Sequence, residues 1–182
     1  NADLSAIDAA LDRLEATLSH LWTVTRTTEP ANAHHVTQLR QRLEDVRRLH
    51  PRLFGQSVRM GNLKVPSFEE LLEQVAPLEA VLPAPFTVFI HGDFNLDNII
   101  YNPATNKLHF IDVYRSREQD YVQDVSVFLI SAFRMPVFAG DVRRKLEHVA
   151  QRVLSFARRF AAENGDVLFE PRLALGLARS FV

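Results

Sequence analysis

The sequence predicts a mostly helical α+β protein with a small β-hairpin core. Three observations lead to this prediction. Apolar residues recur at helical spacing over 1–85, a run of short β-rich segments follows over 86–119, and helical spacing returns over 120–182. Because strands and helices are segregated along the chain, an alternating parallel-sheet fold is disfavoured. We expect a single lobe over 1–182.

Three helices are expected before the β-rich run. Apolar stripes at helical spacing mark the first over 4–25 and the second over 36–49. Ser67 followed by Glu70 is a capping-box pattern, which predicts that a third helix begins there. Pro83 lies where that helix must already have ended.

Short strands occupy the middle of the chain. Residues 86–90 form an apolar run rich in β-branched and aromatic side chains. Two similar runs, 99–101 and 108–111, flank the turn-forming residues 102–106. This arrangement predicts a β-hairpin.

Three more helices are expected after the hairpin. The first runs from Asp120 to Pro136, where the proline ends it. The second covers roughly Asp141 to Asn164, where an Asn-Gly pair is typical of a helix end. The last follows Pro171.

The composition excludes several classes of protein. The 182 residues include no cysteine, which excludes disulfides, thiolate metal sites and a cysteine nucleophile. The formal net charge of -1 provides no overall attraction to nucleic acid, and no apolar run is long enough to span a membrane. We expect a cytoplasmic protein with neither a nucleic-acid nor a membrane partner.

Arginines cluster in and after the second expected helix: Arg40, Arg42, Arg47, Arg48 and Arg52. Glu44 and Asp45 interrupt this run, and few aromatic residues accompany it. A solvated helix face is therefore favoured over a phosphate-binding surface.

The most informative stretch reads H-G-D-x-x-x-x-N from His91 to Asn98, and Asp112 follows the hairpin. Phosphoryl transfer needs an acceptor hydroxyl aimed at the γ-phosphate and a metal ion that holds the phosphate charge. A carboxylate at Asp93 can accept the hydroxyl proton, and Gly92 allows a tight turn before it. The hairpin would bring Asp112 beside Asn98, and their oxygens suit Mg²⁺.

Residues 86–130 resemble the aminoglycoside phosphotransferase family and the related choline and other small-molecule kinases, which share a protein-kinase-like fold. The resemblance implies that Asp93 is the catalytic base. It also implies that Asn98 and Asp112 bind Mg²⁺ and, through it, the nucleotide, which is ATP or GTP. The implied acceptor is a hydroxyl group of a small molecule.

Two residues are expected to support the loop without reacting. The resemblance implies that Asp124, which follows Asp112 in the family pattern, hydrogen-bonds the catalytic loop. His91 is favoured as a buried side chain that bonds the backbone over a role as a general base. Simpler roles stay open for the others, namely a loop cap for Asp93, a turn residue for Asn98 and an ordinary strand-end residue for Asp112.

The part of a kinase that covers the nucleotide has no counterpart in this sequence. The six glycines form no Gly-rich loop, and Lys64, Lys107 and Lys145 do not follow the pattern of a phosphate-pairing strand lysine. The chain also begins with Asn rather than Met. We therefore expect the C-terminal lobe of a kinase-like fold, cut from a longer protein with the N-lobe absent and inactive alone.

Two functions remain in competition. The first is a phosphotransferase that uses nucleotide and Mg²⁺. The alternative is a non-catalytic, kinase-like binding or regulatory module, favoured by the absent lobe and by Val113, where the family usually has an aromatic residue. A lobe that lacks its partner exposes an apolar face, so self-association is expected.

The acceptor pocket is expected around 120–136, as the resemblance implies. Asp120 and Asp124 in this stretch would suit a polyamine, whereas Arg134 would not. Arg115 and Arg117 follow the metal-binding Asp, and they either meet an anionic group or face solvent. The sequence leaves the identity of the acceptor open.

Overall fold

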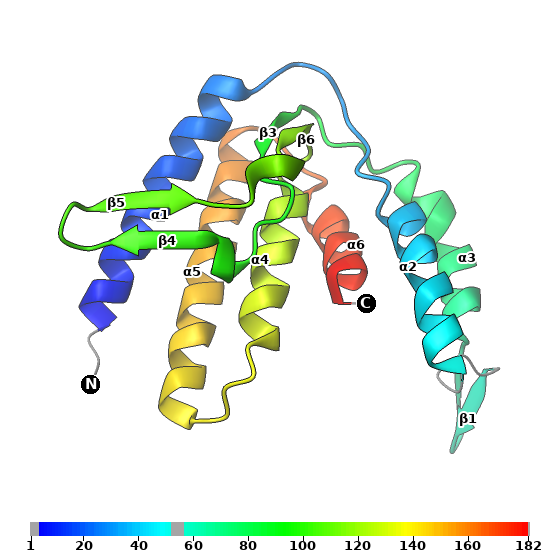
Figure 1. The fold of residues 1–182 in the computed structure, drawn as a ribbon. Helices are drawn as coiled ribbons and strands as arrows, with labels where there is room; N and C mark the ends of the chain where they lie inside the picture. The colour runs from blue at the N-terminus through cyan, green and yellow to red at the C-terminus, as the bar shows by residue number, and fades with distance from the viewer. Residues whose placement is uncertain (1–3, 52–56, 182) are drawn as a thin grey trace.

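The computed structural model describes residues 4–51 and 57–181, and Figure 1 shows their arrangement. Asn1 and Arg52, which entered the interpretation of the sequence, lie outside these ranges. The described helices are α1 (Leu4–Thr25), α2 (His35–Leu49), α3 (Phe68–Glu79), α4 (Val122–Arg134), α5 (Gly140–Glu163) and α6 (Phe169–Phe181). The prediction of a mostly helical α+β fold is confirmed.

The strands form three separate antiparallel pairs. These pairs are β1 (Val58–Met60) with β2 (Leu63–Val65), β3 (Val88–Ile90) with β6 (Arg117–Gln119), and β4 (Ile99–Asn102) with β5 (Lys107–Phe110). The predicted hairpin is β4–β5, with Ile99 opposite Phe110. The pairing of β3 with β6 was not predicted, because a three-residue strand is too short to show an alternating pattern.

An aromatic centre joins the main helices. Trp22 of α1 lies 5.2 Å from Tyr121 between ring centroids, and Tyr121 lies 5.2 Å from Phe160 of α5. All three rings are buried. Since Tyr121 immediately precedes α4, burial of these rings holds α1, α4 and α5 together beneath the hairpin.

Helices α2 and α3 form a smaller apolar cluster around Val36, Leu39 and Leu72. The capping box that opens α3 is confirmed, since Ser67 Oγ accepts the Glu70 N–H at 3.2 Å and Glu70 Oε2 accepts the Ser67 N–H at 2.7 Å. Helix α2 also contacts α6. This contact brings α2 to the edge of the cavity described below.

The final helix begins earlier than expected. Helix α6 starts at Phe169, so Pro171 lies within its first turn instead of preceding it. The N–H groups of a first helical turn have no partner inside the helix, so the missing N–H of Pro171 costs little there. The expectation that the helix follows Pro171 is therefore wrong.

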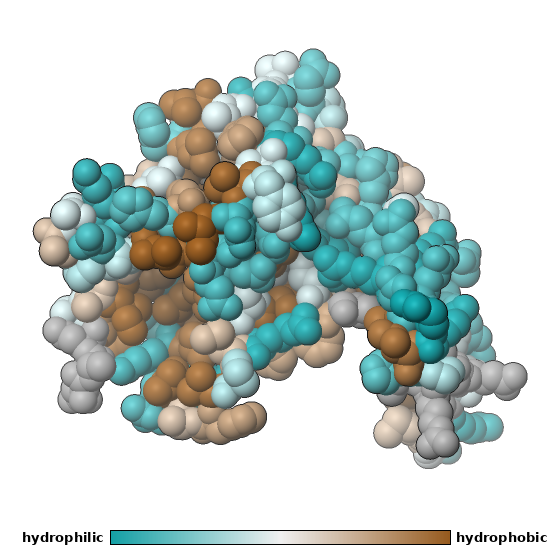
Figure 2. Space-filling model, viewed as in Figure 1, coloured by the Kyte–Doolittle hydropathy of each residue, from teal (hydrophilic) through white to brown (hydrophobic). Residues whose placement is uncertain are grey.

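The surface combines polar and apolar areas. Figure 2 shows apolar side chains gathered over the β4–β5 hairpin and mainly hydrophilic side chains over α2. Within the two described ranges, no helix is both long and apolar enough to cross a membrane.

Candidate active site

The loop 91–98, called the catalytic loop after its predicted role, begins where β3 ends, and a buried carboxylate holds its first two residues. Asp124 in the first turn of α4 accepts the backbone N–H of His91 at 2.7 Å and that of Gly92 at 2.9 Å. Burial raises the pKa of Asp124 to about 6, although the two hydrogen bonds favour its charged form. The start of the loop is therefore fastened to α4.

The imidazole of His91 links the loop to the segment after the hairpin. Its Nδ1 accepts the Asp93 N–H at 3.3 Å, so Nε2 carries the proton and donates to the Ile111 carbonyl at 2.8 Å. The Ser116 hydroxyl donates to the His91 carbonyl at 3.2 Å. The buried ring thus bonds backbone groups on both sides of the hairpin.

Gly92 allows the loop to pass close to the chain that follows the hairpin. Its φ is 82°, in the left-handed region that favours glycine. A Cβ at this position would collide with the carbonyl oxygen of Arg115. The residue therefore satisfies two requirements, one of conformation and one of space.

Asp93 follows directly, and both of its carboxylate oxygens have partners. Oδ1 accepts the Asn95 side-chain amide at 2.7 Å, and Oδ2 forms an ion pair with an Arg115 guanidinium nitrogen at 3.2 Å. The Asp93 side chain is 27% exposed and that of Arg115 54%. The carboxylate is therefore reachable from solvent, and its cationic partner has room to move.

Asn98 and Asp112 lie next to each other, on either side of the hairpin. Asn98 Nδ2 donates to the Asp93 carbonyl at 2.8 Å, and the Ile111 N–H donates to the Asn98 carbonyl at 3.1 Å. Asp112 immediately follows Ile111 and is exposed, with a left-handed φ of 56°. The hydrogen bond between Ile111 and Asn98 therefore holds the backbone at Asp112 beside that of Asn98.

These two side chains fit the demands of Mg²⁺ in their donor chemistry. Both offer hard oxygen ligands, and in the described ranges the Asp112 carboxylate has no ion-pair partner. No group of three or more His, Asp or Glu side chains in those ranges is arranged to hold a metal. A magnesium ion here would need phosphate or water to complete its shell, as is usual for this ion.

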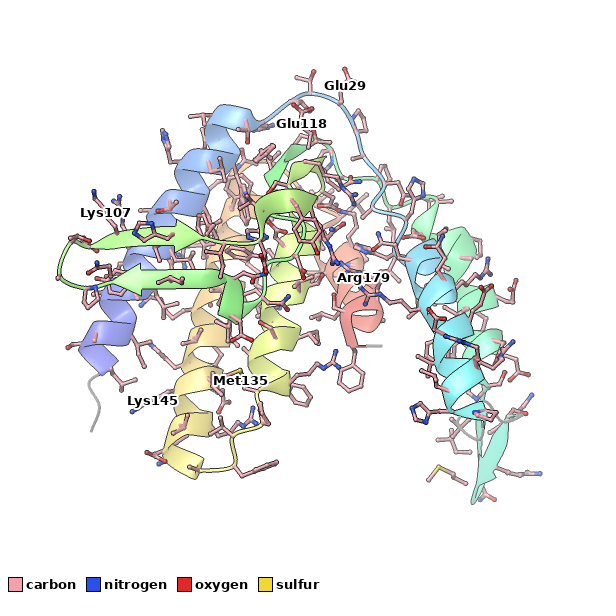
Figure 3. All side chains as sticks on the ribbon, viewed as in Figure 1. Glu29, Lys107, Glu118, Met135, Lys145 and Arg179 are labelled. Carbon is pink, nitrogen blue, oxygen red and sulfur yellow. The ribbon has the colours of Figure 1, made fainter. Side chains whose placement is uncertain are left out.

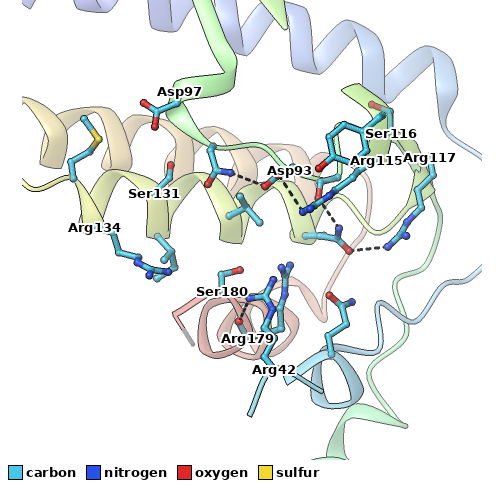
Figure 4. A pocket seen from close by; sticks show the side chains of 18 of the residues that line it. Arg42, Asp93, Asp97, Arg115, Ser116, Arg117, Ser131, Arg134, Arg179 and Ser180 are labelled. Carbon is cyan, nitrogen blue, oxygen red and sulfur yellow. Dashed lines mark hydrogen bonds and ion pairs between the residues drawn. The ribbon is translucent and has the colours of Figure 1, made fainter. Parts of the chain in front are cut away.

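A cavity of about 780 Å³ opens beside Asp93. Its walls come from α2, the catalytic loop, the segment after β5, α4 and α6, and Figure 4 shows the side chains that line it. Asp93 lines this cavity, whereas Asn98 and Asp112 do not. The residues predicted to bind the metal therefore lie outside the cavity lining.

The two aspartates of 120–136 do not line the cavity. Asp120 is buried against Arg172, whose Nε donates to it at 2.8 Å, and Asp124 is buried beneath the catalytic loop. Arg115, Arg117 and Arg134 do line the cavity. Of the three charged residues that the sequence offered for the acceptor pocket over 120–136, Arg134 therefore lines the cavity and the two aspartates do not.

Two cavity residues were not recognised from the sequence. Arg42 belongs to the arginine cluster of α2, of which Arg40 and Arg48 do form exposed ion pairs on a solvated face. Arg42 instead lines the cavity together with Arg179 of α6. The clustering of arginines singled out the segment that contains Arg42, but no local pattern marks Arg179. Figure 3 shows Arg179 on the side of α6 that faces α2.

None of the three lysines lines the cavity. Lys64 is in strand β2, a strand that was not predicted, and it pairs with Glu70 at 3.6 Å. This strand pair lies at the far end of α2 and α3 from the hairpin (Figure 1). Figure 3 shows Lys107 at the hairpin turn and Lys145 on α5, both away from Arg179.

Solved structures of small-molecule kinases resemble this fold. A glucosamine kinase (crystal form A) matches with a TM-score of 0.54 and 23% identity over 94% of this chain and 46% of that chain. A glucosamine kinase in complex with glucosamine, ADP and inorganic phosphate matches with a TM-score of 0.50 and 22% identity over 95% and 47%.

The aminoglycoside phosphotransferase APH(3'')-Id from Streptomyces rimosus ATCC10970, in complex with ADP and streptomycin, matches with a TM-score of 0.53 and 24% identity. That match covers 98% of this chain and 63% of that one. The chain belongs to the phosphotransferase enzyme family, whose model matches residues 1–163. It spans about half the length of the glucosamine kinases. No curated protein matches it in sequence.

Proposed function

We propose that this chain is the catalytic lobe of a phosphotransferase that uses ATP or GTP with Mg²⁺ and phosphorylates a hydroxyl group of a small molecule. One observation carries the proposal. Asp93 lines a cavity of about 780 Å³, while Asn98, at the end of the same loop, and Asp112, just after the hairpin, do not line it. An acceptor on one side and a nucleotide on the other would then meet at Asp93.

In this proposal Asp93 accepts the proton of the acceptor hydroxyl. Its Oδ1 is held by Asn95, which fixes the direction of the carboxylate, so Oδ2 is the oxygen that would receive the proton. Arg115 pairs with Oδ2 in this structure and would have to move aside. Its side chain is more than half exposed, so such a movement meets little packing resistance.

Asn98 and Asp112 are the residues we assign to the metal. When bound, Mg²⁺ would neutralise the charge of the nucleotide phosphates. His91 and Asp124 take supporting roles, because they hold the loop through backbone groups and do not face the cavity. The whole of 1–182 serves as one lobe in this proposal.

A non-catalytic binding module is the alternative. The observation that favours it is the engagement of both Asp93 oxygens, by Asn95 and Arg115. A carboxylate that stayed paired in this way would not be free to contact an acceptor hydroxyl. The two functions differ in whether Arg115 leaves Asp93 when a substrate binds.

We also propose that a separate nucleotide-binding lobe covers the apolar side of the loop. Phe89, Ile111 and Val113 are exposed there, on either side of His91 and next to Asp112. The chain spans only 46% to 47% of the glucosamine kinases, which is consistent with a lobe that needs a partner. Without that partner, the same side chains would favour self-association.

A calorimetric titration with Mg²⁺-ATP and with Mg²⁺-GTP tests the metal and nucleotide assignment. We expect Asp112→Ala to abolish the binding heat. The matched control is Glu118→Ala, which removes an exposed carboxylate of β6 outside the proposed site. Equal binding by the wild type and Asp112→Ala would contradict the role of Asp112.

Turnover in the full-length protein tests the role of Asp93. Asp93→Asn keeps the size of the side chain and removes the base, so we expect turnover to fall by about 10²- to 10⁴-fold with folding unchanged. Retained turnover would refute that role. Absence of turnover in the wild-type protein over a broad panel of hydroxyl compounds would favour the binding module.

A further inference from the structure

The cavity beside Asp93 has a basic lining. Five arginines and two aspartates contribute to it, and no lysine, glutamate or histidine does so in the part of the chain that the structure describes. The arginines come from four parts of the fold, and they are Arg42, Arg115, Arg117, Arg134 and Arg179. A cavity of this kind attracts anions and disfavours cations.

Arg179 is the unusual member of this set. Its residue is only 3% exposed, and two of its guanidinium nitrogens, Nε and one Nη, are buried without a hydrogen-bond partner in the described ranges. The negative charges of Asp124 and Asp93 favour its charged form from a distance, but neither carboxylate forms an ion pair with it. An unpaired buried guanidinium is costly, and a bound anion would remove that cost.

A second guanidinium reinforces the first. Arg42 of α2 donates from its Nη1 to the Arg179 carbonyl at 2.7 Å, which fixes its side chain against α6. Burial lowers the pKa of Arg179 to about 10, and the next largest cause is the positive charge of Arg42. Two cations held together in this way, without an acidic side chain paired to Arg179, form a built site for a carboxylate or a phosphate group.

The site faces the proposed base across the cavity. Figure 4 shows Asp93 and Arg115 on one side and Arg42 and Arg179 on the other. A molecule held at Arg42 and Arg179 by one end would therefore extend its other end toward Asp93.

We propose that the acceptor of this phosphotransferase is an anionic hydroxyl compound, whose carboxylate or phosphate group is bound by Arg42 and Arg179. This inference rests on the proposed function. It separates the chain from the glucosamine kinase and from APH(3'')-Id, whose complexes contain the amines glucosamine and streptomycin. A cationic amine would meet five arginines in this cavity.

Four sugars of similar size test the proposal by direct binding to the 182-residue chain in a calorimetric titration. Gluconate carries a carboxylate, glucose 6-phosphate a phosphate, glucose no charge and glucosamine a positive charge. We expect one or both anions to bind at least about tenfold more tightly than glucose and glucosamine, since charge-assisted hydrogen bonds supply the difference. Preference between the two anions identifies the group that Arg42 and Arg179 recognise.

Variants then locate the site. Arg179→Gln and Arg42→Gln should each weaken binding of the preferred anion by about tenfold or more, and Arg179→Lys should restore part of it. Arg40→Gln is the matched control, because Arg40 lies on the same helix as Arg42 and pairs with Glu73 on the solvent side. Should Arg179→Gln fail to fold, exposed Arg42 provides the independent variant.

Three results would overturn the proposal. These are binding of glucosamine as tight as that of the anions, unchanged anion binding in Arg42→Gln and Arg179→Gln, and no binding of either anion at millimolar concentration. Because none of these measurements involves nucleotide or turnover, such a failure would leave the test of Asp93→Asn unaffected. Conversely, if Asp93→Asn retained turnover, the anion-binding results would still stand.

Discussion

The carboxylate of Asp124 accepts the backbone N–H of His91 at 2.7 Å, joining two residues that are 33 positions apart. A second hydrogen bond, from the N–H of Gly92 at 2.9 Å, uses the other oxygen of the same carboxylate. Asp124 lies in a helix packed against the core, so it holds the loop against a rigid element. The position of Asp93, one residue further on, depends on this contact.

The stability of the protein should depend on the protonation of Asp124. Its pKa is raised to about 6 in the folded chain from an ordinary value of 3.8, so the folded state binds the proton more tightly than the unfolded state. The stabilisation that this bound proton provides amounts to up to about 3 kcal/mol. It is fully present below about pH 4 and is lost as the pH rises through about 6.

Urea unfolding of the wild type and of Asp124→Asn between about pH 4 and pH 7 measures this effect. Asparagine does not titrate, so it is the matched reference. We expect the free energy of unfolding of the wild type, relative to that of the variant, to decrease as the pH rises through this window. A constant difference across the window would show that Asp124 does not titrate there.

Replacing Gly92 with alanine should destabilise the loop. Its φ of 82° disfavours a side chain, and a Cβ would also collide with the Arg115 carbonyl. We expect a loss of about 2–3 kcal/mol in the free energy of unfolding. Gly165→Ala is the control for conformation alone, because Gly165 has a φ of 69° and no atom within 4 Å of an added Cβ. Equal losses would mean that the Arg115 carbonyl moves aside freely.

Replacing Arg172 with methionine should be strongly destabilising. Its guanidinium donates to Asp120 at 2.8 Å and to Asp166 at 2.6 Å, and all three side chains are buried. Removing the cation leaves two buried carboxylates without a counter-charge, at a cost of about 3–5 kcal/mol. Arg158→Met, which removes an exposed pair with Glu170, should cost less than about 1 kcal/mol. Thermal and urea unfolding would detect the contrast, and similar losses in both variants would contradict it.

Truncating Trp22 should disrupt the aromatic centre. Its ring is buried and lies 5.2 Å from Tyr121 and 5.6 Å from Phe156. We expect Trp22→Ala to reduce the free energy of unfolding by about 3–5 kcal/mol, because it removes the largest ring of the core and leaves a cavity. Val24→Ala changes an exposed residue of the same helix and should have an effect below about 0.5 kcal/mol. A small loss in Trp22→Ala would mean that the core closes around the gap.

The helices and the hairpin could be predicted because their signals are local. Apolar spacing located α1 and the capping box located α3, while turn residues located β4–β5. The start of α6 and the pairs β1–β2 and β3–β6 were missed. Because proline is common at the start of a helix, the position of Pro171 suggested that the helix begins after it. Strands of three residues are too short to show an alternating pattern.

The sequence by itself determined the family, because the H-G-D loop, the asparagine and the following aspartates stand at fixed spacing in one continuous stretch. Only the tertiary structure decided what the cavity offers to a ligand. Arg42 and Arg179 are 137 positions apart, and they meet because α2 packs on α6. Helical periodicity reports that a face is buried but not against which other element, so a site built from distant faces has no signature in the sequence.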